Sequence, residues 1–281
     1  MKTEAFQINT SGHGAAFGQY RHLVRKKWLA MAGISFVFAA AVIGALASGA
    51  SDAGLADLVP AIMNPGHPAH GIVVSLRLPR VAMAVLVGSG LAFSGVVFQA
   101  ILRNPLASPY TLGMGSAAGF GAVLPIIFLP SALTRDLWIA GGAFAFTMVS
   151  AFVILTVTRL KNAGSETMIL SGIALMFLFS SLTSFFQYMG AMEQVSEIVF
   201  WFFGSLSKAG WNEIALASVM VLGPFPLILR LAPDFNLILT GDDAAKGLGV
   251  NVPRLRMEAL ILASLATAGS ICFTGVIGFV G

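Results

Sequence analysis

The sequence predicts an all-α, polytopic membrane protein with about seven membrane-spanning helices and short cytoplasmic helices. Three observations predict this fold class. Hydrophobic residues make up 57% of the 281 residues and charged residues 10%, whereas a soluble domain carries roughly 25% charged residues. The mean hydropathy is +0.87. Seven runs contain no Asp, Glu, Lys or Arg, and most reach the ~20 residues that a helix needs to cross a hydrocarbon core about 30 Å thick.

The seven runs follow one another to the end of the chain. They lack the alternation of polar and apolar residues that strands of a membrane barrel carry, and only helices otherwise satisfy the backbone in lipid. We therefore expect each run to form one spanning helix. The runs are Trp28–Ala50, Val81–Leu102, Asn104–Thr134, Leu137–Thr158, Thr167–Met192, Ile214–Leu229 and Ala259–Gly281.

The segment before the first run is polar. We expect residues 1–27 to form a cytoplasmic tail and residues 28–281 to form the membrane domain. Met1–Gln19 has no apolar core, so no cleavable signal peptide is predicted.

An outer loop, Ser51–Ser75, follows the first run and contains His67 and His70. An H-x-x-H pair can contribute to a metal site, but such a site needs further ligands held rigidly. The nearest carboxylates, Asp52 and Asp57, are distant in the sequence. We therefore expect no metal site.

Two further connections have recognisable signals. Asn104-Pro105 is expected to turn the chain tightly and start the third helix, since proline suits a helix start and disfavours helix in the residue before it. The outer segment Glu193–Trp211 contains an apolar stretch, Ile198–Phe203, that is too short to span. We expect an interfacial or re-entrant helix there.

Most basic residues fall on one side of the membrane. With a cytoplasmic N-terminus, twelve of the sixteen Lys and Arg residues lie inside, which is the usual bias of membrane proteins. The net charge of +4 is therefore explained by topology. We expect membrane lipid, and no nucleic acid, among the partners.

Pro233–Arg256 is the most polar internal segment and predicts two short amphipathic helices in the cytoplasm. Asp234 can cap the first, Phe235–Leu239, and Asp242 can cap the second, Asp243–Leu248, with Gly249 as the stop. Two interpretations are open. The segment is either a folded loop on its own bundle or a docking element for a cytosolic partner.

Arg77 and Arg80 lie at the outer mouth of the second run, against the charge bias. They either reach toward lipid headgroups or form a cationic patch that pairs with carboxylates of an external partner. Small residues crowd the second and third runs and predict close helix packing, with lining of a pathway as the alternative. The packing candidates are Gly88, Gly95, Gly115 and Gly119.

Several absences narrow the function. No G-x-x-x-x-G-K-[ST] motif occurs, so the chain does not bind ATP through a P-loop. No nucleophile–base set or metal cluster is evident, so we expect neither an enzyme nor a cofactor. A single cysteine, Cys272, excludes disulfides and cysteine metal sites. No carboxylate lies deep in a run, which disfavours a secondary carrier coupled to protons or sodium.

Several motifs closely resemble the family of ABC importer permeases for iron chelates (siderophores), haem and cobalamin. They cover the chain from about Trp28 to its end, in order. The motifs are Arg77-Leu-Pro-Arg80, Gly95–Pro109, Leu112-Gly113, Gly115–Gly119, Phe200–Ser207, Leu248-Gly249-Val250 and Phe273–Gly281.

The resemblance implies a permease domain over residues 28–281 that works with a permease dimer partner, two cytosolic ATPase subunits and an extracytoplasmic binding protein. Arg77 and Arg80 would meet glutamates of the binding protein. A cytoplasmic gate would lie at Ser165 and Glu166, where the family has a small polar residue in place of the glutamate. The pathway would be lined by Ser171, Gly172, Ser180 and Ser184. The coupling helices that dock in the ATPase would be formed by Gly241, Asp242, Asp243, Ala244, Ala245, Lys246, Gly247, Leu248 and Gly249.

The expected function is that of a non-catalytic subunit in the cytoplasmic membrane, which imports a ferric siderophore or a similar iron chelate. Haem, cobalamin or an oxyanion are alternative substrates, and a secondary carrier or a membrane scaffold are alternative functions. Family members resemble ten-helix proteins, and Gly281 falls where their eighth helix begins. The C-terminal helices are therefore expected to be missing, through an incomplete sequence or a truncated product.

Overall fold

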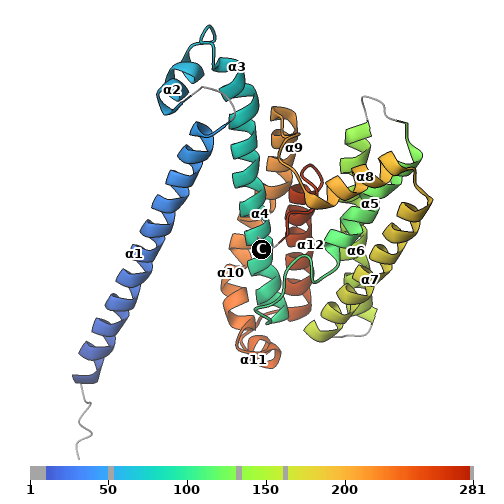
Figure 1. Ribbon diagram of the computed structural model, residues 1–281. Coiled ribbons are helices and arrows are strands. Elements are labelled where there is room, and N and C mark those ends of the chain that lie inside the picture. The colour runs from blue at the N-terminus through green and yellow to red at the C-terminus, as the bar shows by residue number, and fades with distance from the viewer. Residues whose placement is uncertain (1–10, 50–53, 131–134, 161–163, 279–281) are drawn as a thin grey trace, which may run out of the picture. The chain divides into compact units, whose positions relative to one another are not determined.

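The structure, a computed structural model, describes residues 11–49, 54–130, 135–160 and 164–278, and every regular element within these ranges is helical (Figure 1). The chain divides into two compact units, Met1–Arg77 and Leu78–Gly281. The all-α fold predicted from the charge-free runs is confirmed.

In its described residues, 11–49 and 54–77, the first unit contains four helical elements. They are α1 (Ser11–Ala47), α2 (Leu55–Met63), α3 (His70–Ile72) and a π-helical turn, η1 (Val73–Arg77). Helix α1 contains most of the first predicted span and begins earlier, so residues 11–27 of the expected tail are helical. Residues 1–10 lie outside the described part.

The two histidines of the outer loop, His67 and His70, contact residues of α2. The Asp57 Oδ2 atom accepts the Gly54 backbone N–H at 2.9 Å, and its Oδ1 lies 4.0 Å from His67 Nε2. His70 Nδ1 lies 2.6 Å from the Ala61 carbonyl oxygen. Asp57 is thus near His67 in space although it is distant in sequence. Among the described residues no group of three or more His, Cys, Asp or Glu could hold a metal, and Asp52 lies outside them.

The second unit contains the remaining helices. They are α4 (Leu78–Leu102), α5 (Met114–Phe128), α6 (Arg135–Leu160), α7 (Ser165–Met189), α8 (Met192–Phe203), α9 (Trp211–Leu222), α10 (Pro224–Ile238), α11 (Asp242–Gly247) and α12 (Val252–Ile271).

Five helical segments of the described chain are long and apolar enough to cross a membrane: Val24–Ala47, His70–Leu102, Arg135–Leu160, Ser165–Met189 and Trp211–Ile238. The other two predicted runs also contain helices, α5 of 15 residues and α12 of 20 residues. Helix α12 is less apolar because charged residues occupy its first turns.

The helix predicted to start at Asn104 begins at Met114 instead. The intervening segment contains turns, in which Ala107 N–H donates to the Asn104 carbonyl and Gly113 N–H to the Tyr110 carbonyl. Gly113 has a φ of +72°, a conformation that glycine adopts without steric cost. These turns shorten α5 relative to its charge-free run.

The prediction that a separate helix begins after Asp234 is wrong. It continues through Pro233 to Ile238, so Asp234 lies inside α10 and does not cap a separate helix. The missing proline N–H leaves the Leu229 carbonyl without its helical donor. Burial of Ile228 and Ile238 in the core offsets that loss.

Close helix contacts in the second unit depend on glycine. A Cβ atom at Gly121 of α5 would collide with the Gly142 backbone of α6, and one at Gly142 would collide with the Gly121 carbonyl. The two backbones therefore touch, as small residues allow in membrane helices. Around this contact, α5 is nearly completely buried.

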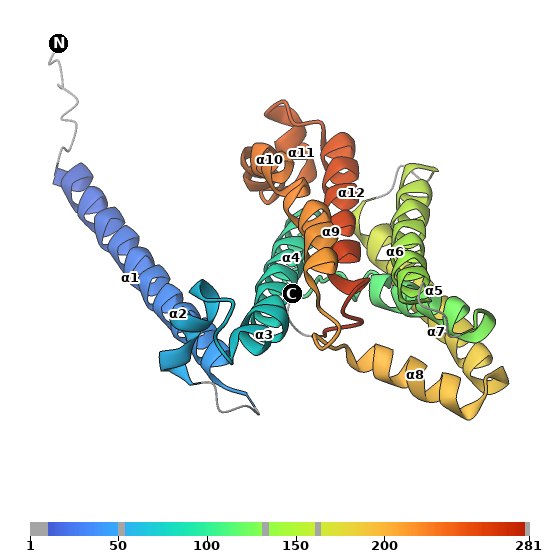
Figure 2. The same ribbon diagram turned by 90° about the horizontal axis from the view of Figure 1, so that it is seen from above.

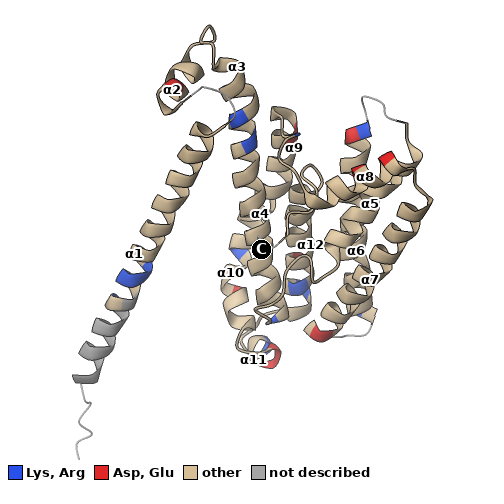
Figure 3. Ribbon diagram, in the orientation of Figure 1, with Lys and Arg blue, Asp and Glu red and all other residues tan. Residues whose placement is uncertain are grey.

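Two short helices mark opposite ends of the second unit. Helix α8 lies across one end of the longer helices, and α11 lies at the other end (Figures 1 and 2). Most charged residues of this unit also lie toward the two ends (Figure 3). This is the pattern expected when the middle of each helix faces lipid or the core.

Candidate functional site

Helix α11 is short and both of its boundaries depend on glycine. Gly241 precedes it with a φ of +118°, and Gly249 follows it with a φ of +92°. L-residues with side chains rarely adopt these values. The predicted stop at Gly249 is confirmed, because the turn ends with the Gly249 N–H donating to the Lys246 carbonyl.

Asp242, the first residue of α11, is held by two arginines. Arg256 Nη1 lies 2.9 Å from Asp242 Oδ2, and Arg256 Nη2 donates to Oδ1 at 3.0 Å. Arg103 Nη2 lies 3.5 Å from Oδ1. The paired two-bond geometry is the strong form of an arginine–carboxylate contact.

Arg256 extends the same network to α4. Its Nε donates to the Ile101 carbonyl oxygen at 3.1 Å, and only 8% of its side chain is exposed. Ile101 is in the last turn of α4, and Arg256 is in the first turns of α12. One network therefore joins three helices.

The inner face of α11 packs on its own bundle. Ala245 is fully buried in a small apolar cluster with Ile238, Val250, Val252 and Leu255. The outer face carries exposed residues: Asp243, which pairs with Lys246 at 3.3 Å, and Leu248, which is 64% exposed. The segment is therefore a folded loop on its own bundle with an exposed outer face, and docking of a cytosolic partner on that face stays a prediction.

A hollow of about 670 Å³ lies beside α11, between the ends of α6 and α7 and the start of α12. Basic side chains line it, among them Arg159, Lys246 and Arg254. Arg254 donates to Glu258 at 2.7 Å, and this hydrogen bond raises the pKa of the Arg254 guanidinium. The hollow and the exposed side of α11 together form the candidate docking surface.

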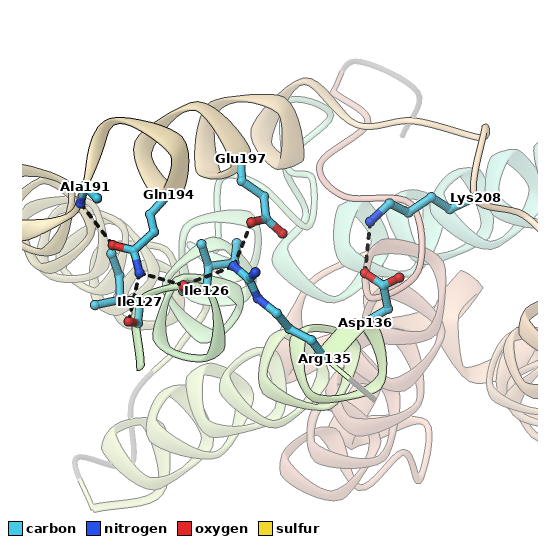
Figure 4. A network of polar contacts seen from close by, with 8 residues as sticks. All are labelled: Ile126, Ile127, Arg135, Asp136, Ala191, Gln194, Glu197 and Lys208. Atoms are coloured by element: carbon cyan, nitrogen blue, oxygen red, sulfur yellow. Dashed lines mark hydrogen bonds and ion pairs between the residues drawn. The ribbon is translucent and has the colours of Figure 1, made fainter. Parts of the chain in front are cut away.

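At the opposite end, α8 is the expected non-spanning helix. Its Glu197 accepts a hydrogen bond from Arg135 Nη2 at 2.6 Å, and Arg135 also donates to the Ile126 carbonyl at 3.1 Å. Gln194 Nε2 donates to the Ile127 carbonyl at 3.0 Å (Figure 4). These contacts hold α8 against the ends of α5 and α6.

Two further features complete that end of the unit. Lys208 Nζ lies 2.9 Å from Asp136 Oδ1, with both side chains largely exposed (Figure 4). On the outer face of α8, Phe200 is 71% exposed and Phe203 75% exposed. Amphipathic helices that lie at a membrane surface present aromatic residues in this way.

The two arginines predicted to dock a binding protein differ in their surroundings. Arg77 is 7% exposed, and its Nη1 donates to the Leu46 carbonyl at 2.8 Å, in the last turn of α1. A cation there satisfies carbonyls that a helix end leaves unpaired. Arg80 is exposed. Only Arg80 therefore presents its charge at the surface.

The predicted gate and pathway residues lie on α7. Ser165 starts the helix and Glu166 in its first turn is exposed. Ser180 is exposed and donates to Ser116 of α5 at 3.2 Å, and the Ser184 hydroxyl bonds the Ser180 carbonyl.

The remaining two pathway candidates are less open to solvent. Ser171 is half-buried. Gly172 is buried, and a Cβ there would collide with the Leu112 backbone. Gly172 therefore packs closely against the backbone before α5, and its place along a pathway stays a prediction.

The four glycines predicted to pack helices have different roles. Gly115 lies against the Tyr110 ring and Gly119 against the Phe202 ring, so both make close contacts, although with side chains and not with another helix backbone. Gly95 is buried. A Cβ at Gly88 would meet nothing within 4 Å, which does not fit the predicted packing role.

The sequence does not single out Arg103, Arg135 and Arg256 as functional candidates, because in the sequence they contribute only to the distribution of basic residues. Their partners lie far away in the chain, and no local spacing reveals them. The one available signal was that Arg103 and Arg256 fall on the same side of the membrane as Asp242.

The profile of the FecCD transport family matches residues 37–281. The chain belongs to the FecCD transport family. A solved structure, described as an inward-facing conformation of a metal-chelate type ABC transporter, is similar with a TM-score of 0.75 and 28% sequence identity. The alignment covers 88% of this chain and 76% of that one.

Several curated FecCD-like permeases are similar in sequence. The cobalamin import permease BtuC of Halobacterium salinarum is 35% identical over 76% of this chain and 57% of its own. The hemin permease HmuU of Yersinia pestis is 35% identical over 75% of this chain and 64% of its own. The Fe(3+)-citrate permease YfmE of Bacillus subtilis is 35% identical over 80% of this chain and 66% of its own. The molybdate permease MolB of Haemophilus influenzae is 34% identical over 75% of this chain and 62% of its own. The match spans less than two thirds of each of these relatives.

Proposed function

We propose that this FecCD-family chain is the non-catalytic, membrane-spanning permease subunit of an ABC importer. ATP hydrolysis takes place on two separate cytosolic ATPase subunits, and a second permease subunit completes the pathway. The observation that carries the proposal is α11: a short helix fixed by a part-buried ion-pair network, with an exposed outer face and a hollow of about 670 Å³ beside it. A rigid projection of this kind suits a partner that pushes on the membrane helices.

The subunit lies in the cytoplasmic membrane with its N-terminus and α11 inside. An extracytoplasmic binding protein docks on the outer end, where Arg80 pairs with a carboxylate. Arg77 contributes to that docking only if it leaves the carbonyls at the end of α1, so Arg80 carries the main charge.

The substrate is a ferric siderophore or a similar iron chelate. The similar permeases are named for hemin, Fe(3+)-citrate, cobalamin and molybdate. Three of these four are metal chelates, which favours a chelate and keeps an oxyanion as the second candidate. Co-purification of the binding protein and identification of its bound ligand by mass spectrometry decides between them.

The proposal is tested by purifying the tagged chain from the membranes of its own host. We expect an ATPase and a binding protein to co-purify, with ATP hydrolysis stimulated by the loaded binding protein. Leu248→Asp, on the exposed side of α11, should abolish recovery of the ATPase. Asn236→Asp, at an exposed position of α10, is the matched control for Leu248→Asp and should leave recovery of the ATPase unchanged. Purification without any ATPase would overturn the proposed function.

A further inference from the structure

Arg103 has a backbone conformation that its residue type rarely adopts. Its φ of +49° is the one positive value for a residue other than glycine among the described residues. Arg103 ends α4 in a Schellman turn, in which the Asn104 N–H donates to the Gln99 carbonyl and the Arg103 N–H to the Ala100 carbonyl. Glycine is the usual residue at this position, because a Cβ atom in the left-handed region costs free energy.

Such strain persists where the side chain is needed for something else. The Arg103 side chain reaches Asp242, 3.5 Å away, from the end of α4. Asp242 is the first residue of α11, and Arg256 holds it from the other side at 2.9 Å. A glycine at this turn would relieve the strain and lose the contact. The arginine is therefore better explained by the contact than by the turn.

The network also has the geometry of a mechanical connection. Arg256 is nearly buried and bonds both carboxylate oxygens of Asp242 and the Ile101 carbonyl. Asp242 cannot move away from α12 without breaking its two-bond ion pair and leaving the nearly buried Arg256 guanidinium without a carboxylate, which is unfavourable. In contrast, the outer pair of α11, Asp243 and Lys246, is exposed and of little energetic consequence.

We propose that Asp242, clamped by Arg103 and Arg256, is a joint that transmits displacement of α11 to the C-terminal end of α4 and the first turns of α12. All three are positioning residues, because they act through the helices and touch neither ATP nor substrate. The inference rests on the proposed function, since it needs an ATPase that moves α11. It adds which helices receive that movement and through which atoms.

The decisive variant is Arg103→Gly, studied in the co-purified assembly reconstituted in proteoliposomes. Thermal stability should be unchanged or higher, because glycine tolerates the left-handed turn. ATPase recovery should stay within about twofold. The amount of substrate imported per ATP hydrolysed should fall about fivefold or more, the lower bound of a typical coupling between sites.

A second readout needs no transport. In the wild-type assembly, binding of a non-hydrolysable ATP analogue should change hydrogen exchange of the backbone amides in residues 96–104, at the end of α4. In Arg103→Gly that response should be lost while the response of α11 remains. A purely structural role predicts the same exchange response in both proteins.

Matched variants keep the test sharp. Arg256→Lys retains the charge but loses the two-bond geometry, and should uncouple import from hydrolysis as Arg103→Gly does. Arg230→Lys, at an exposed arginine of α10 outside this network and outside the hollow, should change neither. If Arg103→Gly folds poorly, Arg103→Asn replaces it, since asparagine also tolerates the left-handed region.

The outcomes separate the two proposals. Failure of wild-type protein to retain any ATPase overturns the proposed function and the joint with it. If the wild-type assembly imports substrate with ATP hydrolysis, and the variants show the same import per ATP and the same exchange response as wild type, the joint alone is overturned. Equal losses of ATPase recovery and import in Arg103→Gly assign Arg103 to docking and also reject the joint.

Discussion

At the scale of single residues, Arg77 and Arg80 have the same chemistry and different surroundings. Arg77 donates to carbonyls at the end of α1 and is nearly buried, whereas Arg80 is exposed. A buried charge that is fully engaged supports the fold, and an exposed one acts on partners through long-range attraction. The two roles can be separated experimentally.

Reversal of the exposed charge, Arg80→Glu, should weaken association with the binding protein about tenfold at low salt, with a smaller effect at high salt because exposed charges are screened. Arg77→Gln should instead lower the free energy of unfolding by about 1–3 kcal/mol, since it removes a charged donor from part-buried carbonyls. Binding kinetics at two salt concentrations and thermal unfolding measure these effects. Equal loss of association in both variants would show that both arginines dock.

At the scale of helices, the contact between α5 and α6 depends on two glycines whose backbones touch. Gly121→Ala should lower stability by about 1–3 kcal/mol, because the added methyl group forces the two helices apart. The measurement is thermal unfolding in detergent. Gly88→Ala is the matched control, since its methyl group meets nothing within 4 Å, and it should leave the unfolding temperature unchanged or raise it slightly. Comparable losses in both variants would reject the close contact.

The ion pair between Glu197 and Arg135 is one of the contacts that hold helix α8. Glu197→Gln removes the negative charge that pairs with Arg135, whose side chain is 15% exposed, and should make opening of α8 easier by about 1–3 kcal/mol. Hydrogen exchange over residues 192–203 measures this opening. Lys208→Gln disrupts the neighbouring exposed pair and should change the same exchange by less than about 1 kcal/mol. A larger effect from Lys208→Gln would contradict the account.

At the scale of the whole molecule, the two ends of the second unit are expected on opposite sides of the membrane. A cysteine at Lys246 in α11 should react with an impermeant thiol reagent only from the cytoplasmic side, and a cysteine at the exposed Met192 of α8 only from outside. The native Cys272 is buried and is replaced by alanine as the background. Labelling of both positions from one side would overturn the topology.

Composition and charge-free runs predicted the helices, the non-spanning α8 and the position of α11, because lipid imposes simple requirements on backbone and side chains. Local rules failed where tertiary packing decided the outcome. Asp234 is predicted to cap a separate helix, but α10 continues through Pro233 to Ile238. The joint at Asp242 could not be predicted, since its partners, Arg103 and Arg256, meet it only after α4, α11 and α12 are assembled.

The central claim is that the exposed side of α11 meets an intracellular ATPase. Leu248 is 64% exposed on that side, so Leu248→Cys carries a short cross-linker in membranes from the native host, with Phe200→Cys on α8 as the opposite-end control. The account predicts a cross-link from position 248 to the ATPase and none from position 200. A cross-link to the ATPase from position 200, with none from position 248, would contradict it.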